Sequence, residues 1–141
     1  DFKIKTDKVV YLSDYAHHPE EIKQSILSVR ALYQDKKLTA VFQPHLYTRT
    51  RDFYQEFADS LSLLDEVILT DIYPARELPI EGVSSQLIYD HLSPNVEKTL
   101  CKKEEVLELL KNKNIEVLIT LGAGDIENYA SQICEILNQQ C

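Results

Sequence analysis

The chain has 141 residues, which suits one domain with a hydrophobic core of its own. Hydrophobic residues make up 44% of it and charged residues 27%, the composition of an ordinary globular protein. The formal net charge of -8 argues against nucleic acid or an anionic membrane as a general partner, so an anionic ligand would need a local basic patch. No apolar run has the length of a membrane helix, and no signal-peptide pattern is present.

The three cysteines, Cys101, Cys134 and Cys141, are odd in number and lack the spacing of metal ligands. They are typical of free thiols in a reducing compartment, and we therefore expect a cytoplasmic protein. The first residues already have the pattern of a strand, so we expect the chain to be cut from something longer.

The start of the chain predicts an antiparallel hairpin followed by a helix. Residues 2–5 alternate between apolar and polar, residues 6–7 suit a turn, and residues 9–12 form an apolar run typical of a buried strand. Pro19 suits the first helical position, and the two glutamates after it are favourable at the positive end of the helix dipole. One apolar face follows, at Ile22, Ile26, Val29 and Leu32.

Strands and helices then alternate to the end of the chain. Apolar runs predict further strands at residues 38–42, 66–70, 96–101 and 115–121, with 96–101 the weakest and most peripheral. Helical spacing predicts a helix after each of them, and the helix between strands 66–70 and 96–101 is expected to be short. This alternation implies an α/β fold: a Rossmann-like, mostly parallel sheet with helices on both faces and an N-terminal antiparallel strand.

The helices carry their own expectations about burial and capping. The helix after strand 38–42 is expected to bury Phe53, Phe57, Leu61 and Leu64, with Thr48 or Thr50 as its N-cap. Ser84 or Ser85 suits the N-cap of the short helix, and Asp125 suits that of the last one. The last helix is expected to bury Ile126, Tyr129, Ala130, Ile133 and Leu137.

Four segments rich in polar and titratable residues directly follow predicted strands, at 14–19, 43–51, 71–83 and 122–126. In a parallel sheet the carboxyl ends of the strands meet at one edge, where ligands bind. We therefore expect these segments to converge there. Segment 71–83 is too long for an ordinary connection, which favours a binding or lid role.

The first of these segments concentrates Asp14, Tyr15, His17 and His18. Imidazoles can donate hydrogen bonds to carboxylate or phosphate, and a tyrosine ring offers a flat face for contact. The alternative is a helix-capping aspartate beside two exposed histidines. We expect no structural zinc site, because adjacent histidines rarely share a metal and no cysteine spacing supports them.

The strongest basic cluster comprises His45, Tyr47, Arg49 and Arg51. Arginine suits bidentate recognition of carboxylate or phosphate. The alternative is that both arginines are surface helix residues paired with Asp52 or Glu56. We favour that alternative for Arg51 and a functional role for Arg49, which lies nearer the strand end.

A glycine-containing turn, Gly122-Ala123-Gly124-Asp125, joins the most apolar strand to the last helix. Backbone N–H groups exposed in such a turn suit an anion, although Gly124 could also supply the turn alone. The chain contains no G-x-x-x-x-G-K-[ST] loop and no serine or cysteine nucleophile motif. It therefore lacks the usual apparatus for cleaving ATP.

Four ordered motifs carry a family resemblance: D-Y-A-H-H-P-x-E at 14–21, F-Q-P-H-x-Y-T-R-T at 42–50, D-x-Y-P-A-x-E at 71–77 and G-A-G-D-I at 122–126. Together they resemble the C-terminal domain of the Mur ligases, closest to the members that add L-alanine, over nearly the whole chain. The resemblance implies that residues 1–141 are one domain, the amino-acid-binding and closing domain of a three-domain cytoplasmic enzyme of peptidoglycan synthesis.

The resemblance also implies the reaction and its partners. The N-terminal domain would bind UDP-N-acetylmuramate, and the central domain would carry the P-loop and most ligands of Mg2+. ATP would phosphorylate the muramate carboxylate to an acyl phosphate, which the amine of L-alanine then attacks. This chain would be inactive alone, in keeping with its missing P-loop.

Carried over by position, Tyr15, His17 and Arg49 resemble the amino-acid-binding and closure residues, and we place His18, His45 and Tyr47 in the same substrate site. Asp14, Tyr15 and the turn Gly122, Ala123, Gly124 and Asp125 would border the nucleotide. The resemblance implies no metal ligand and no certain catalytic residue in this domain. Leu46 stands where many relatives have arginine, and Ala16 where they often have glycine.

Two other functions stay open at the level of sequence. A sister enzyme that ligates recycled murein tripeptide to the same sugar nucleotide shares the four motifs. The chain could also be a free-standing, non-catalytic nucleotide-binding module, which would begin near Asp1 in its native form and bind ATP on its own.

Overall fold

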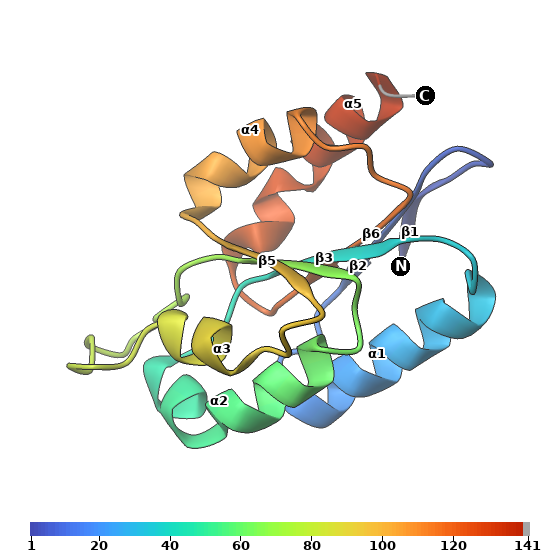
Figure 1. The fold of residues 1–141 in the computed structure, drawn as a ribbon. Helices are drawn as coiled ribbons and strands as arrows, with labels where there is room; N and C mark the ends of the chain where they lie inside the picture. The colour runs from blue at the N-terminus through green and yellow to red at the C-terminus, as the bar shows by residue number, and fades with distance from the viewer. Residues whose placement is uncertain (140–141) are drawn as a thin grey trace.

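The computed structural model describes residues 1–139, so Cys141 lies outside the described part. A six-stranded sheet forms its centre, in the order β1-β2-β6-β3-β4-β5 (Figure 1). β1 pairs with β2 in antiparallel fashion, and the remaining neighbours are parallel. The strands are β1 (Phe2–Lys5), β2 (Val10–Asp14), β3 (Leu38–Phe42), β4 (Glu66–Leu69), β5 (Glu97–Leu100) and β6 (Val117–Leu121).

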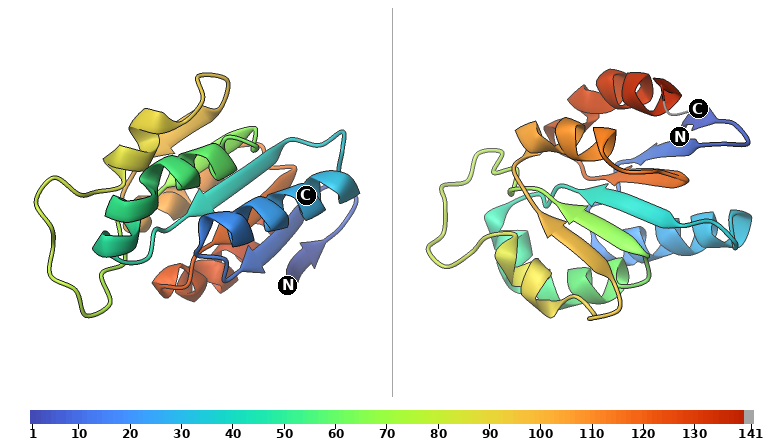
Figure 2. Two further views of the ribbon diagram at one scale, coloured as in Figure 1. Left: turned by 90° about the horizontal axis from the view of Figure 1, so that it is seen from below. Right: turned by 45° about the horizontal axis from the view of Figure 1, so that its top comes forward.

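Helices cover both faces of this sheet. Figure 2 shows the first three α-helices packed on one face and the last two on the other. The predicted α/β class, the hairpin and the peripheral position of β5 are all confirmed. The helices are α1 (Pro19–Leu32), α2 (Tyr47–Leu61), α3 (Gln86–His91), α4 (Val106–Lys111) and α5 (Ala130–Gln139), with 3-10 turns η1 (Lys103–Glu105) and η2 (Asp125–Tyr129).

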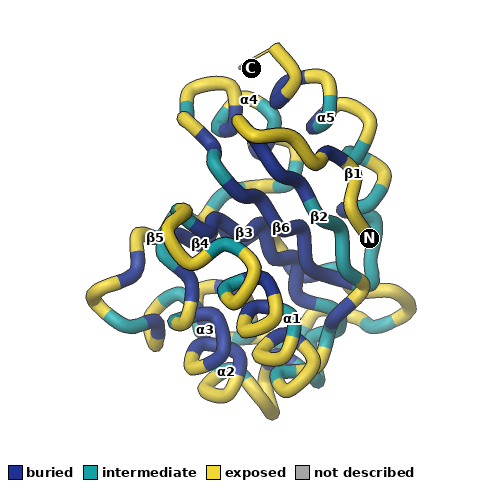
Figure 3. The backbone as a smooth tube through the Cα atoms, turned by 90° about the vertical axis from the view of Figure 1, so that its right-hand side faces the viewer, coloured by how far each residue is buried: buried dark blue, intermediate teal, exposed yellow. Residues whose placement is uncertain are grey.

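The core has two apolar layers, one on each face of the sheet. Successive side chains of a strand point to opposite faces, so Ala40 and Phe42 pack toward α1 and α2 while Val41 packs toward α4 and α5. All residues of β3, β4 and β6 are buried, as expected for central strands covered on both sides (Figure 3). None of the helices among the described residues is long and apolar enough to cross a membrane.

Some predicted side-chain positions are wrong. Phe53 is 43% exposed, because the backbone of α2 leaves helical geometry at this residue and turns its side chain out of the apolar stripe. Leu32 is 65% exposed at the last position of α1, and Tyr129 and Ala130 are only half-buried. Of the two serines before α3, Ser84 accepts the N–H of Gln86, whereas the Ser85 hydroxyl donates to the carbonyl of Thr70.

Candidate functional site

The carboxyl ends of β2, β6, β3 and β4 lie side by side at one edge of the sheet. The Gly122 N–H donates to the Asp14 carbonyl at 3.2 Å, and the Gln43 N–H donates to the Leu121 carbonyl at 3.1 Å. Beyond β4, segment 71–83 extends from the sheet as a long loop, and its Tyr73 N–H donates to the Pro44 carbonyl at 2.8 Å (Figures 1 and 2). The predicted convergence of the four segments is therefore confirmed.

A row of aromatic rings crosses this edge. The imidazoles of His17 and His18 have centroids 4.8 Å apart, and those of His17 and His45 are 5.8 Å apart at nearly right angles. The ring of Tyr73 stacks on His45 at 5.7 Å with an interplanar angle of 12°. Residues from the ends of three strands thus form one connected surface.

Arg49 joins this row through His45. Its Nη1 lies 3.2 Å from Nδ1 of His45. Since a guanidinium has only donors, the imidazole nitrogen accepts, and the proton of the neutral ring is on Nε2. Burial lowers the pKa of His45, and the nearby charges of Arg49 and His17 lower it further. His45 is therefore a neutral imidazole that presents an N–H donor on the side away from Arg49.

The start of α1 is capped from within its own segment. Pro19 is the first helical residue, and the Glu21 carboxylate accepts the N–H groups of His17 and His18 at 3.2 and 3.1 Å. These bonds, chiefly the one from His17, lower the pKa of Glu21. Glu21 rather than Asp14 is thus the capping acid.

Asp14 and Tyr15 form hydrogen bonds that shape the turn before α1. One Asp14 oxygen accepts the Ala16 N–H at 2.9 Å, and the other is paired with the Ser25 hydroxyl. The Tyr15 carbonyl accepts Nδ1–H of His17 at 2.8 Å, while the Tyr15 side chain is 66% exposed at the edge. The phenol ring is thus open to a ligand, and the Asp14 carboxylate is already engaged.

The start of α2 is capped from a distant segment. The Glu77 carboxylate accepts the N–H groups of Tyr47 and Thr48 at 2.5 and 3.2 Å, together with the Thr48 hydroxyl. The prediction of Thr48 or Thr50 as N-cap is wrong: the Thr50 hydroxyl donates to the Leu46 carbonyl at 3.0 Å. The N-cap position is Leu46, whose φ of 74° is rare for a residue with a side chain.

Sequence reasoning missed Glu77, and one signal could have found it. The first turn of α2 contains no acidic residue of its own, while segment 71–83 is overlong and contains acids. The hydrogen bond from the Thr48 hydroxyl is the main cause that lowers the pKa of Glu77. Glu77 is thus an ionised carboxylate that fastens this loop to the helix that carries Arg49.

The two glycines of segment 122–126 are required by close packing. A Cβ at Gly122, where φ is 143°, would lie 2.8 Å from the Gln43 carbonyl oxygen. A Cβ at Gly124 would lie 2.6 Å from both Gln43 Oε1 and Tyr73 Cγ. Neither position has room for another residue without a shift of its neighbours.

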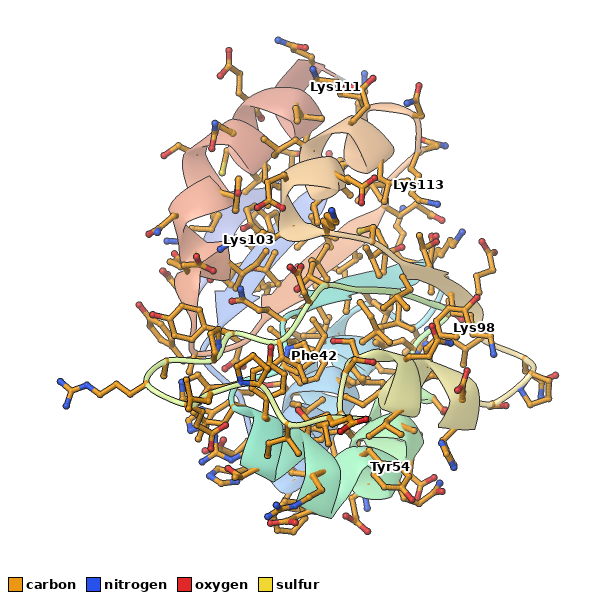
Figure 4. The ribbon with its side chains drawn as sticks, turned by 90° about the vertical axis from the view of Figure 1, so that its left-hand side faces the viewer. Phe42, Tyr54, Lys98, Lys103, Lys111 and Lys113 are labelled. Carbon is orange, nitrogen blue, oxygen red and sulfur yellow. The ribbon has the colours of Figure 1, made fainter. Side chains whose placement is uncertain are left out.

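Gln43 and Asp125 connect this turn to β3. The Gln43 side chain is buried, with Nε2 donating to Asp125 at 2.6 Å and Oε1 accepting the Ile126 N–H at 3.0 Å. Asp125 also pairs with Lys103, and these bonds lower its pKa although burial opposes the charge. The prediction of Asp125 as N-cap is wrong, since Gly124 holds that position. Lys103 belongs to η1, which precedes α4 in the chain, and it is labelled in Figure 4.

Arg51 lies outside the cluster, as the sequence favoured. Its Nε donates to Asp52 at 2.9 Å, and both side chains are about half exposed. Arg49 and Arg51 thus differ in surroundings although only one residue separates them in α2.

Within the described residues, His17, His18 and Glu21 each bring a donor atom within 4.8 Å of the others. His17 Nδ1 and Glu21 Oε1, which lie 3.8 Å apart, already bond to the Tyr15 carbonyl and to backbone N–H groups. A metal ion bound through these two atoms would have to displace these bonds. The cluster is thus better explained as the start of α1 than as a metal centre.

The fold is that of a Rossmann-like domain, a class in which ligands bind at the carboxyl ends of the strands. The family model of the Mur ligase, glutamate ligase domain, matches residues 2–126. The chain therefore belongs to this family, and the resemblance found in its four motifs is confirmed.

Individual relatives agree with this assignment. The chain is 79% identical over 140 residues to a UDP-N-acetylmuramate--L-alanine ligase of Phocaeicola vulgatus, covering 99% of this chain and 31% of that protein. A solved UDP-N-acetylmuramate-alanine ligase of Thermotoga maritima matches with a TM-score of 0.78 at 24% identity, over 99% of this chain and 30% of that one. A solved domain from Haemophilus ducreyi matches with a TM-score of 0.69 at 19% identity, over 100% of this chain and 98% of that domain.

Proposed function

We propose that residues 1–141 are the C-terminal, amino-acid-binding domain of a longer ATP-dependent ligase that joins L-alanine to UDP-N-acetylmuramate. The 79% identity to a ligase of that name supports the assignment, and the chain spans about 31% of that protein's length. The observation that carries the proposal is the junction of His17, His45 and Arg49 at one sheet edge. We place the protein in the cytoplasm, where free thiols such as Cys101 and Cys134 persist.

Each group at this edge has a defined role in holding the amino acid. The Arg49 guanidinium forms charge-assisted hydrogen bonds with the carboxylate of L-alanine. His17 keeps its Nδ1–H on the Tyr15 carbonyl and, as an imidazolium, contributes a further donor from Nε2. His45 supplies a neutral Nε2–H beside them. The exposed ring of Tyr15 packs against the methyl group, while His18 and Tyr47 border the site.

This arrangement contributes to the reaction by positioning. With its carboxylate held at Arg49, the amino acid presents its amine to the activated carboxyl carbon of the muramate. The amine forms the new C–N bond, and the bond from that carbon to the phosphate oxygen breaks as phosphate leaves. Fixing two reactants in this geometry lowers the entropic part of the barrier.

ATP binding requires the rest of the longer protein. The Asp14 and Asp125 carboxylates are engaged by Ser25 and by Gln43 and Lys103, so this donor set does not fit Mg2+. We therefore assign Mg2+ and the phosphates chiefly to the central domain. The turn from Gly122 to Asp125, together with Asp14 and Tyr15, borders the nucleotide when the domains close.

The test is kinetic and uses the full-length enzyme. Arg49→Ala is expected to raise the KM for L-alanine about tenfold or more, the scale of a lost charge-assisted contact, and to leave the KM for ATP unchanged. Arg51→Ala is the matched control, since Arg51 lies on the same helix but pairs with Asp52. Unchanged kinetics of Arg49→Ala would remove the assigned role.

The same assay separates the other two functions. Wild-type enzyme that accepts the murein tripeptide and rejects L-alanine would identify the tripeptide ligase. A native chain that begins near Asp1 and binds ATP by itself would identify the free-standing module.

A further inference from the structure

Tyr73 contacts two of the segments that form the site. Its ring is stacked on the imidazole of His45, and its Cγ lies where the Cβ of any larger residue at position 124 would point. The ring therefore lies against His45 from segment 43–51 and against Gly124 from the turn after β6. Neither the motifs nor the family resemblance assigned a role to this side chain.

The backbone of Tyr73 is fixed independently of its side chain. Its N–H donates to the Pro44 carbonyl at 2.8 Å, and its carbonyl accepts the Leu46 N–H at 2.9 Å. These bonds form a parallel bridge between His45 and Tyr73, beyond the last pair of the β3–β4 ladder, Phe42 and Leu69. Substitution of the ring consequently leaves the loop attached at this point.

The stacked ring determines how His45 meets Arg49. An imidazole can rotate about the bond that joins it to Cβ, and its ring torsion is intrinsically broad. Tyr73 fixes the plane of the ring by stacking, and His17 meets it edge-on at 5.8 Å. In this plane Nδ1 points at Arg49 Nη1, 3.2 Å away.

We propose that Tyr73 is a positioning residue, whose ring fixes the plane of His45 and, through Nδ1 of His45, the Arg49 guanidinium that receives the amino-acid carboxylate. This inference rests on the proposed function in one respect, that Arg49 binds the carboxylate. The link from Tyr73 through His45 to Arg49 stands on the contacts alone.

The surroundings of His45 supply an independent readout. Arg49 from α2 and His17 from the turn before α1 disfavour its protonation, Glu77 from the loop favours it, and burial is the largest cause of its lowered pKa. Tyr73 covers one face of the imidazole. Removing the ring opens that face to water and raises the pKa of His45 toward its ordinary value of 6.5.

The first experiment titrates the histidines of this chain by NMR in wild type, Tyr73→Leu and Tyr73→Phe. We expect the pKa of His45 to rise in Tyr73→Leu and to stay at the wild-type value in Tyr73→Phe, which keeps the flat ring. Tyr54→Leu is the matched control, because Tyr54, labelled in Figure 4, contacts His91 at 4.9 Å on the α2–α3 side. That variant should leave His45 unchanged.

The chain has a hydrophobic core of its own, with apolar layers on both faces of the sheet, so the titration can use this domain by itself. A solved domain of the same span from Haemophilus ducreyi has the same fold. Circular dichroism confirms that each variant is folded, and Tyr73→Ala, which keeps the backbone bridge, replaces Tyr73→Leu if the latter does not fold. A folded variant without the ring and with an unchanged His45 pKa overturns the proposal.

The second experiment measures ligation by the full-length enzyme. Tyr73→Leu should raise the KM for L-alanine by about tenfold without a matching change in the KM for ATP, and Tyr73→Phe should restore it. An equal loss in Tyr73→Phe and Tyr73→Leu overturns the positioning role. If the wild-type enzyme does not use L-alanine, the proposed function fails, while the His45 titration still decides whether Tyr73 positions the imidazole.

Discussion

The two helix starts at the functional edge are built in opposite ways. α1 is capped by Glu21, three residues beyond its N-cap His18, so the acid and its donors belong to one short segment. α2 is capped by Glu77, which lies 30 residues beyond Tyr47 and reaches the helix from the loop after β4. Local sequence builds the first helix start, and the tertiary fold completes the second.

This difference has a functional consequence. The start of the helix that follows His17 and His18 is capped by Glu21, a residue of its own first turn. The segment with His45 and Arg49 depends on remote supports, among them Glu77 at the helix start and the Gln43 side chain bonded to the turn at 125–126. The helix cap on the arginine side of the site therefore depends on a distant segment, whereas the cap of α1 does not.

The largest expected effect is at Gln43. Gln43→Leu leaves the buried N–H of Ile126 without its acceptor and removes a partner of Asp125. We expect the free energy of unfolding, measured by urea denaturation at pH 7, to fall by about 2 kcal/mol. Gln24→Leu is the control, since the Gln24 amide bonds to exposed Glu20 in the same helix. A change below about 0.5 kcal/mol in Gln43→Leu would show that this remote support is dispensable.

Glu77→Gln should release the loop without unfolding the domain. The neutral amide weakens the bonds to the Tyr47 and Thr48 N–H groups, so segment 71–83 opens more often. The exposed Arg76 precedes Glu77, and tryptic cleavage after Arg76 should accelerate several-fold. Glu21→Gln, which weakens the other helix start, should leave that cleavage rate unchanged. Equal cleavage rates in wild type, Glu77→Gln and Glu21→Gln would contradict the role of Glu77 in holding segment 71–83 against α2.

Glu77→Gln should also change how the stability of the fold depends on pH in the acidic range. The Glu77 pKa is lower in the folded protein than its ordinary 4.5, chiefly through the hydrogen bond from the Thr48 hydroxyl. The carboxylate therefore stabilises the fold above pH 4.5, and that contribution is lost as the pH falls through the lower, folded pKa. Because glutamine does not titrate, Glu77→Gln should lose less stability than wild type over this acidic range, as followed by thermal melting.

The same contrast explains what could be predicted from sequence. The strands and the start of α1 follow from short patterns: apolar runs, Pro19 at the first helical position and glutamates behind it. The exposure of Phe53 could not be predicted, because it depends on a local departure from helical backbone. Glu77 and Tyr73 were missed for a similar reason. Both pair with residues of segment 43–51, and although the first turn of α2 lacks an acid of its own, no spacing along the chain identifies which distant residue supplies one.

The smallest expected effect is at Glu21, and its control is built into the same turn. Glu20 and Glu21 both occupy the first turn of α1, where the helix dipole stabilises a negative charge. Glu21 in addition accepts the N–H groups of His17 and His18. Glu21→Gln should lower the free energy of unfolding by about 0.5 kcal/mol more than Glu20→Gln does, and this difference isolates the cap from the charge.

The outcome at Glu21 also decides how independent the two helix starts are. If α1 is capped locally, Glu21→Gln leaves the His45 titration and the tryptic cleavage after Arg76 at their wild-type values, since neither depends on that cap. A shift in either would mean that strain passes from the α1 turn to Arg49 across the contact between His17 and His45. The two sides of the site would then act as one unit, and substitutions at Glu21 and Glu77 would be non-additive.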